Sequence, residues 1–210
     1  MSSKISALVI THNEANNIKD LIENLNFTDE IIIVDSFSTD RTLAILENYS
    51  HVRVYQHVFK DFSSQRNIAL KYASHEWILF IDADERISEN LKKEILETVS
   101  LKNSNQGYFF KRKFYFLDKR INFSGLRTDK NLRLFKKEGA IYHGLVHEKV
   151  NIKNTGTFKN FLTHFSYTSH KHFKSKIIYY NKLKALEKIT KGKKHSLVME
   201  IFHPIYTFLN

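Results

Sequence analysis

Two carboxylates one residue apart follow a strongly apolar run near the middle of the chain. The segment Asp82-Ala83-Asp84-Glu85 comes directly after Trp77-Ile78-Leu79-Phe80-Ile81, which has the composition of a buried strand. A strand that delivers carboxylates into the following loop offers the oxygen ligands that Mg²⁺ or Mn²⁺ prefers, with water and substrate phosphates completing the shell. Such a loop can hold a metal-bound diphosphate, although acidic residues at the end of a strand also form solvated turns and helix N-caps.

Two further polar clusters stand at comparable positions. Thr11-His12-Asn13-Glu14 follows the apolar residues 5–10, and Asp35-Ser36-Phe37-Ser38-Thr39-Asp40 follows the apolar residues 31–34. Parallel strands place their carboxyl ends at one edge of a sheet, and ligands of such sheets bind beyond that edge. We therefore expect all three clusters to converge on one site.

The elements that must position these clusters alternate between strand and helix. Apolar strands are expected at residues 5–10, 31–34, 52–55 and 77–81, and helices at residues 18–25, 43–49, 64–73 and 88–99. This pattern predicts an α/β fold with a mostly parallel central sheet flanked by helices on both faces.

The second half of the chain changes in character. Aromatic-rich strands around residues 108–116, 132–135 and 158–165 predict a smaller region of antiparallel or mixed pairing. From residue 172 to residue 191 apolar side chains recur at helical spacing beside a basic face, which predicts a C-terminal basic helix.

The composition bounds the function. With 210 residues and 42% hydrophobic content the chain can bury a real core, and the absence of Cys excludes disulfides and Cys-ligated zinc. The formal net charge is +11, and residues 171–194 contain nine Lys but only one acidic residue, Glu187. Such a block indicates an anionic partner or a solvated helix face. No apolar stretch approaches the roughly 20 residues needed to span a bilayer.

Taken together, the motifs resemble glycosyltransferase family 2, whose fold is the Rossmann-like GT-A fold. The resemblance rests on the three clusters above and on Gln65-Arg66-Asn67, and it covers about the first hundred residues. The second half resembles the bacterial subgroup that builds lipopolysaccharide core or other surface glycans, through less specific segments. These segments are Leu132-Arg133-Leu134-Phe135, Val146-His147-Glu148, His164-Phe165-Ser166-Tyr167 and His203-Pro204.

The resemblance implies three regions within one GT-A domain. Residues 1–100 form a nucleotide-sugar-binding half, residues 101–168 an acceptor-side half, and residues 169–210 a basic amphipathic helical segment. The donor would be a nucleotide sugar, with UDP as the expected nucleotide, and the acceptor a glycolipid or lipopolysaccharide. Residues 171–210 would dock on an anionic membrane, so that the enzyme lies in the cytoplasm at the inner face of the cytoplasmic membrane.

The resemblance also assigns roles to single residues. Asp35 would read the uracil base, Asp84 and His164 would bind Mn²⁺ or Mg²⁺, and Arg66 would point toward the diphosphate unless it forms a surface ion pair. Gln65 and Asn67 would only hold a loop. The complete set of expected donor-binding residues is Thr11, Asn13, Glu14, Asp35, Ser36, Arg66, Asp82 and Ala83.

An inverting hexosyl transfer needs a base that accepts the proton of the acceptor hydroxyl. The resemblance points to Glu148, where a His-Glu pair replaces the more frequent Glu-Asp pair, and Glu85 and Asp129 are the next candidates. Glu148 could equally be a surface carboxylate on a strand. Arg127 and Arg133 could contact phosphates or be ordinary surface charges.

Two other functions are compatible with parts of the sequence. A sugar nucleotidyltransferase would also use an acidic metal site, but residues 7–17 lack the Gly-rich phosphate loop expected of that class. A nucleic-acid-binding module would fit the isoelectric point of about 9.6 and the abundant aromatic residues. The strand-end carboxylates favour the glycosyltransferase, for which no nucleic-acid partner is expected.

Overall fold

The computed structural model describes residues 3–116, 119–121, 129–144 and 148–167, with the single positions 170, 174, 178, 181, 182 and 185 beyond them. The described positions after residue 167 are helical. Apart from these single positions, the predicted basic helix and the membrane-docking segment at residues 171–210 lie outside the described residues, as do Arg127, Val146 and His147.

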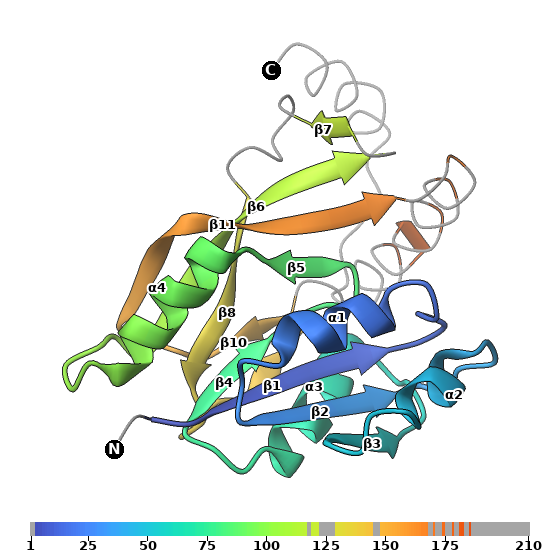
Figure 1. Cartoon of the computed structure of the whole chain (residues 1–210), viewed down its shortest axis with the longest axis horizontal. Helices are drawn as coiled ribbons and strands as arrows, with labels where there is room; N and C mark the ends of the chain where they lie inside the picture. The colour runs from blue at the N-terminus through green and yellow to red at the C-terminus, as the bar shows by residue number, and fades with distance from the viewer. Residues whose placement is uncertain are drawn as a thin grey trace.

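Four parallel strands form the first half of the main sheet (Figure 1). In chain order its elements are β1 (Ile5–Thr11), α1 (Ile18–Leu25), β2 (Glu30–Asp35), α2 (Thr42–Leu46), β3 (Val52–Gln56), α3 (Phe62–Tyr72) and β4 (Trp77–Phe80). The strands lie in the order β3-β2-β1-β4, so the chain extends first to one side of β1 and then to the other. This reversal opens a crevice at the carboxyl ends of β1 and β4, where ligands of such sheets bind.

The second half continues the same sheet with mixed pairing. Its elements are β5 (Glu85–Ile87), α4 (Glu89–Ser100), β6 (Gly107–Phe116), β7 (Lys119–Ile121), β8 (Lys130–Lys136), β9 (Tyr142–His143), β10 (Lys149–Val150) and β11 (Thr155–Tyr167). The order runs β4-β8-β6-β11-β5, with β7 on the edge of β6. β8 is antiparallel to β4 and β6, and β11 is parallel to β6 but antiparallel to β5. The predicted mixed region therefore exists as an extension of the parallel sheet, while β9 and β10 form a small separate pair.

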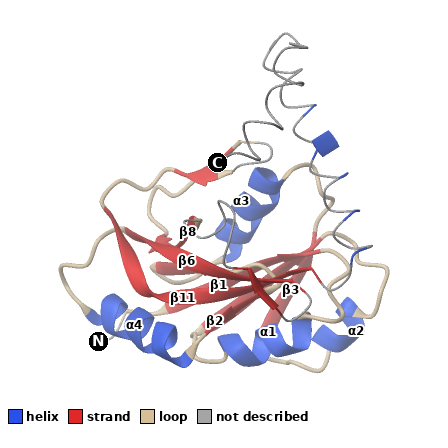
Figure 2. Cartoon of the chain, turned by 90° about the horizontal axis from the view of Figure 1, so that it is seen from above, coloured by secondary structure: helices blue, strands red, loops and turns tan. Residues whose placement is uncertain are grey.

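Alternate strand residues fill two cores on opposite faces of the sheet. Ile5, Ala7 and Val9 of β1 belong to one core, together with the apolar stripes of α1 and α4, whereas Leu8 packs on the other face with α3 residues. Figure 2 shows α1, α2 and α4 on one face of the sheet and α3 on the other. Because both faces are covered, the strands of the parallel half are nearly continuous apolar runs, as predicted.

The helices follow the predicted stripes with one exception. Side chains expected on the inner faces of α1 and α4 are buried, and the hydroxyl of Ser88 caps α4 by accepting a hydrogen bond from Leu91 N at 3.3 Å. The helix expected at residues 43–49 is shorter, because α2 ends at Leu46 and Tyr49 lies outside it. In the part of the chain that the structure describes, no helix combines the length and the apolar character needed to cross a bilayer.

Candidate active site

The acidic loop between β4 and β5 is a tight, internally bonded turn. Asp82 N donates to the Glu85 carboxylate at 3.0 Å, and Glu85 N donates back to the Asp82 carbonyl at 3.0 Å. The Arg86 guanidinium donates to the carbonyl of Ala83 at 2.8 Å. These bonds fix the directions in which the carboxylates of Asp82 and Asp84 project.

A cavity of about 1220 Å³ lies at the carboxyl ends of the parallel strands. Its wall combines residues from both halves of the sheet. The clusters that follow β1 and β4 line it, whereas the cluster at residues 35–40 does not. Among the predicted site residues that line it are Thr11, Glu14, Arg66, Asp82, Ala83, Asp84, Asp129, Arg133, Glu148 and His164.

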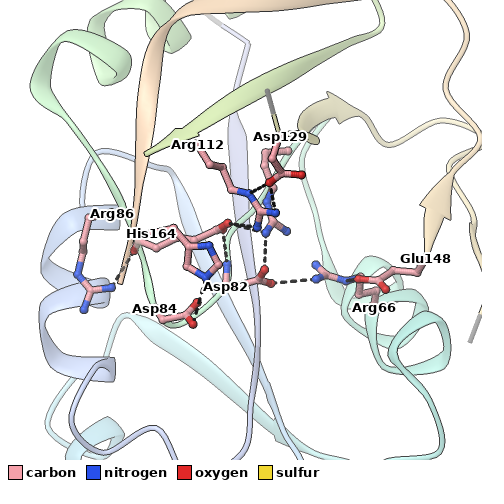
Figure 3. Close-up of polar contacts among 10 residues, drawn as sticks. Arg66, Asp82, Asp84, Arg86, Arg112, Asp129, Glu148 and His164 are labelled. Atoms are coloured by element: carbon pink, nitrogen blue, oxygen red, sulfur yellow. Dashed lines mark hydrogen bonds and ion pairs between the residues drawn. The ribbon is translucent and has the colours of Figure 1, made fainter. Parts of the chain in front are cut away.

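Asp84 and His164 meet on this wall, although 80 positions separate them in the chain. His164 Nε2 lies 3.2 Å from Asp84 Oδ2, and both side chains are 14% exposed (Figure 3). Their contact follows from pairing of β5 with β11, in which Phe165 N also donates to the Asp84 carbonyl at 2.8 Å. The ring atom His164 Nδ1 is buried and has no hydrogen-bond partner among the described residues.

The pair has the donor chemistry of a divalent metal site. A carboxylate oxygen and an imidazole nitrogen that lie 3.2 Å apart could bind one divalent transition-metal ion, with water and phosphate oxygens as the other ligands. Within the described residues, no three His, Asp or Glu side chains form a metal-binding group. A metal here would therefore take two ligands from Asp84 and His164 and the others from its substrate and from water.

Asp82 lies between two buried arginines. Arg66 Nη2 lies 2.9 Å from Asp82 Oδ1, and Arg133 contacts Asp82 Oδ2. The guanidinium carbon of Arg66 also lies 4.3 Å from the ring centre of Phe80. Arg66 and Arg133 are only 5% and 4% exposed, so the alternative of surface charges is wrong for both.

The ion pairs continue to both ends of the cavity wall (Figure 3). Arg66 Nε donates to Glu148 Oε1 at 2.8 Å, which joins Asp82 to the first candidate base. Arg133 Nη2 lies 2.7 Å from Glu85 Oε1, and Arg112 Nη1 lies 3.4 Å from the same oxygen. The members of this arginine–carboxylate chain are, in spatial order, Glu148, Arg66, Asp82, Arg133, Glu85, Arg112 and Asp129.

The ion pairs set the protonation of the buried groups. Burial alone would raise the pKa of the Asp82 carboxyl, but the guanidinium groups of Arg133 and Arg66 hold that pKa well below its usual range. Burial raises the pKa of Tyr142, another cavity residue, to about 12. Asp82 is therefore an anion and Tyr142 a neutral phenol across the physiological pH range.

The two loops at the ends of β1 and β2 are bonded to each other. Asp35 is fully buried and accepts hydrogen bonds from Thr11 Oγ1 at 3.1 Å and from Ser38 N at 2.8 Å. Asn13, which has a left-handed φ of 57°, accepts a hydrogen bond from Thr39 N at 2.8 Å. Hydrogen bonds thus join the two loops beside the cavity, which Thr11 and Glu14 line but Asn13, Asp35 and Ser36 do not.

The profile of the family described as "Glycosyl transferase family 2" matches residues 6–148 of this chain, which span β1 to the candidate base Glu148. The chain belongs to glycosyltransferase family 2. It is therefore a glycosyltransferase that uses a nucleotide sugar, and its α/β sheet is the GT-A fold of that family.

Relatives are found over nearly the whole chain. An uncharacterized glycosyltransferase of Rickettsia conorii is 30% identical over 93% of this chain and 74% of its own length. The lipopolysaccharide core biosynthesis glycosyltransferase LpsC of Rhizobium meliloti is 29% identical over 98% of this chain and 79% of its own. The structure of S. aureus TarS 1–349 in complex with UDP-GlcNAc is similar in fold, with a TM-score of 0.59 and 19% identity. That match covers 81% of this chain but only 60% of the TarS chain.

Several predicted residues of the glycosyltransferase hold the site rather than face it. Gln65 Nε2 donates to Ser36 Oγ at 2.9 Å, which fixes the loop after β2. Asn67 Nδ2 donates to the Tyr142 carbonyl at 2.9 Å, and its Oδ1 accepts from Tyr142 N at 2.8 Å. Gln65 therefore holds a loop, as expected, whereas Asn67 holds strand β9.

The assignment of Glu85 as a candidate base needs correction. Its side chain has no exposed surface, and its carboxylate is occupied by Arg133 and by the backbone N–H of Asp82. A base must reach the acceptor hydroxyl, which a carboxylate enclosed in this way does not do. Glu85 instead holds Asp82 and Arg133 in place.

Sequence reasoning missed Arg112, which joins Glu85 to Asp129 in the glycosyltransferase. The signal was present in the alternation of the strand residues. Arg112 lies on the same side of β6 as Phe110 and Phe114, and both of these aromatic residues are buried. A charged residue on an otherwise apolar strand face indicates a buried ion pair.

Proposed function

We propose that the chain is an inverting, metal-dependent hexosyltransferase that moves a sugar from a UDP-sugar to a lipopolysaccharide core, glycolipid or other surface-glycan acceptor. The observation that supports this most directly is the contact of Asp84 with His164 on a cavity that also holds two candidate bases. The placement we propose for the enzyme is the cytoplasm, at the inner face of the cytoplasmic membrane.

A metal ion is part of this proposal. The arginine–carboxylate chain contains three guanidinium groups and four carboxylates, with Asp84 beside them, whereas the cavity wall as a whole has as many Lys and Arg as Asp and Glu side chains. A diphosphate brings further negative charge next to Asp82 and Asp84, and a cation bound there would offset it. Bound by Asp84 and His164, a Mn²⁺ or Mg²⁺ ion would supply Lewis-acid stabilisation of the departing diphosphate.

We propose Glu148 as the base. Arg66 holds Glu148 Oε1 at 2.8 Å and Asp82 at 2.9 Å, so the base is fixed relative to the acidic loop. Its carboxylate would take the proton of the acceptor hydroxyl while the acceptor oxygen bonds to the sugar C1. The C1–oxygen bond to the diphosphate breaks in the same step, and its electron pair leaves with UDP. Attack from the face opposite the diphosphate inverts the configuration at C1.

The uridine would lie over the loops that follow β1 and β2. We propose contacts from Thr11, Asn13, Glu14, Asp35, Ser36 and Ala83, with Asp35 reading the uracil. Because Asp35 now accepts hydrogen bonds from Ser38 and Thr11, the uracil must replace one of these donors to bind it. TarS, which shares the fold, was solved with UDP-GlcNAc, so the fold accommodates a uridine diphosphate sugar. The likeness to LpsC supports a lipopolysaccharide-type acceptor.

A nucleotide panel tests the donor and the metal together. Thermal unfolding is measured with UDP, GDP, CDP and dTDP, each with and without Mn²⁺, for the unaltered protein and for Asp84→Asn. A ligand that binds only the folded protein raises the unfolding temperature. We expect UDP to stabilise most, only with Mn²⁺, and Asp84→Asn to lose the Mn²⁺-dependent part. Equal stabilisation by all four nucleotides would reject uracil reading, and an unchanged response of Asp84→Asn would reject the metal site.

A further inference from the structure

The strands of the acceptor-side half are strongly basic. β6, β7, β8 and β11 contain Lys and Arg residues but not one Asp or Glu. Arg112 and Arg133 are used in the site, and Lys136 pairs with Glu76 at 2.8 Å. The remaining cations of these strands have no acidic neighbour within the strands that carry them.

Three of these lysines gather on one face of the sheet. Lys111 of β6 stands directly opposite Lys130 of β8, and Lys113 follows on the same face of β6. Lys111 and Lys130 are exposed, whereas Lys113 is half-buried. Like charges directly opposed across two strands destabilise the pairing, so this arrangement favours an anionic ligand that relieves the repulsion.

Aromatic rings lie beneath the ammonium groups. Lys113 Nζ lies 4.6 Å and Lys111 Nζ 5.8 Å from the ring centre of Phe161 on β11. Lys130 Nζ lies 5.1 Å from the ring centre of Phe109. Phe165 lies four positions after Phe161 on the same side of β11, and it is 38% exposed. We call this surface the basic face: Lys111, Lys113, Lys130, Phe109, Phe161 and Phe165.

The basic face borders the active-site cavity. It lies on the opposite side of β6 from Phe110 and Phe114, which are buried in the core or against the site. Lys130 and Phe109 belong both to the basic face and to the cavity wall. A surface that docks on this face therefore places the cavity beside it.

We propose that the basic face binds the phosphate headgroups of an anionic lipid membrane and so presents the cavity to a lipid-linked acceptor. The proposal rests on the proposed function for the identity of the acceptor, and it adds a docking surface within residues 109–165. Ammonium groups attract lipid phosphates, while the lysine stems and the Phe rings present apolar bodies to the interface.

The same chemistry argues against a nucleic acid. Single-stranded nucleic acids bind through bases that stack on open aromatic faces. Here lysine ammonium groups lie over the rings of Phe109 and Phe161, so a base would have to displace them to stack on those faces.

Vesicle sedimentation tests the proposal with the full chain. The vesicles are phosphatidylcholine alone or with about one third phosphatidylglycerol, a fraction chosen to give the strong negative surface potential of an anionic membrane. We expect binding only to the anionic vesicles, and about 100-fold weaker binding by K111E/K113E/K130E, since each Lys near the surface contributes about fivefold.

A matched variant controls for overall charge. K19E/K93E/K102E changes three exposed lysines on or next to α1 and α4, across the sheet from the basic face. It alters the formal net charge of +11 by the same amount, and we expect its binding to stay within about threefold of the unaltered protein. K111Q/K113Q/K130Q guards against misfolding, because removal of repelling charges keeps the unfolding temperature while binding still weakens.

Equal weakening by both charge-reversal variants, or none by either, would overturn the basic face as a docking site. Tight, salt-dependent binding of single-stranded RNA through the same lysines, without vesicle binding, would also overturn it. Nucleotide binding by the unaltered protein is measured separately, so failure of vesicle binding leaves the proposed UDP-sugar chemistry standing.

Discussion

The parallel strands β1, β2 and β4 carry their functional carboxylates at or just beyond their carboxyl ends, whereas β6, β8 and β11 carry functional charges within the strands. The charged residues of β6, β8 and β11 are only Arg, Lys and His. Arg133 of β8 reaches Asp82 after β4, and His164 of β11 reaches Asp84. Each half therefore completes a charge arrangement that the other half leaves unbalanced.

This division has a consequence for stability as well as for chemistry. Asp82 and Glu85 are enclosed at the seam between the halves, where an unpaired carboxylate is costly. Arg133 of β8 contacts both carboxylates, while Arg66 of α3 also pairs with Asp82 and Arg112 of β6 with Glu85. Two of these three arginines come from the second half of the sheet, so the acidic loop is fully neutralised only when that half has formed.

The largest expected effect comes from removing the catalytic base, which lies at one of the two ends of the arginine–carboxylate chain. Glu148 is joined to the parallel half through Arg66, and Asp129 is held by Arg112 in the mixed half. We expect Glu148→Gln to lower kcat by about 1000-fold, since removal of a general base costs 10²- to 10⁴-fold. Asp129→Asn is the matched control, with a loss below about tenfold. UDP release in the presence of acceptor is the measurement, and the reverse ranking would move the base to the mixed half.

The next largest effect comes from breaking the ion pairs that join the two halves of the sheet. Arg133→Met leaves Asp82 and Glu85 without their shared cation, and we expect a loss of about 3–5 kcal/mol in the free energy of unfolding. Lys136→Met on the same strand removes a more exposed pair with Glu76 and should cost less than about 1 kcal/mol. Urea unfolding at neutral pH gives both values. Equal losses would mean that the ion pairs of Arg133 contribute no more to the free energy of unfolding than a surface ion pair.

The sequence predicted the parallel half better than the mixed half for a physical reason. In the parallel half, motif and element are local, because each polar cluster follows its own apolar strand. In the mixed half, the partners of Tyr108 and Phe109 on β8 are Leu134 and Leu132, so Arg133 is an extra residue on β8 at this irregularity of the register. The burial of Arg112 and Arg133 depends on that register and on pairing with distant strands, which short-range patterns do not contain.

Single residues of the site could also be predicted only where their contacts are local or were implied by the family resemblance. The pairing of Asp84 with His164 was expected from the family resemblance and is present. The enclosure of Glu85 could not be foreseen, because it depends on Arg133, which is 48 positions away in the chain. The fully buried state of Asp35 likewise depends on the loop 35–40 folding back onto Thr11.

A smaller effect is expected from the hydrogen bonds that attach α4 to β11 in the mixed half. Glu94 of α4 accepts hydrogen bonds from Lys159 N at 2.8 Å and Asn160 N at 3.0 Å on β11. Burial would raise the pKa of Glu94, but these hydrogen bonds lower it further than burial raises it. Its stabilisation is therefore present above the unfolded-state pKa of about 4.3 and is lost as the pH falls through the lower folded-state pKa.

We expect Glu94→Gln to unfold with about 1 kcal/mol less free energy at pH 7, and this difference should close as the pH falls below about 4. Urea midpoints measured between pH 7 and pH 3 test the effect. Glu97→Gln, an exposed change on the same helix, should shift stability by less than about 0.5 kcal/mol. A gap for Glu94→Gln that persists at pH 3 would show that charge is not the cause.

The smallest effect concerns strain in the parallel half. Phe37 has a left-handed φ of 55° and is 50% exposed, so little packing compensates its backbone strain. We expect Phe37→Gly to raise the free energy of unfolding by about 0.5 kcal/mol, whereas Phe37→Ala keeps the strain and gains nothing. Thermal and urea unfolding compare the two. A clear loss of stability in Phe37→Gly would show that the ring packs more tightly than its exposure indicates.

The central claim is that side chains from both halves of the sheet hold one metal ion and the diphosphate beside it. A crystal structure with UDP and Mn²⁺, with manganese located by its anomalous scattering, tests this most directly. The account predicts one manganese within about 2.5 Å of Asp84 Oδ2 and His164 Nε2, bridging to the phosphates. Manganese bound without His164, or UDP bound away from the acidic loop, would contradict it.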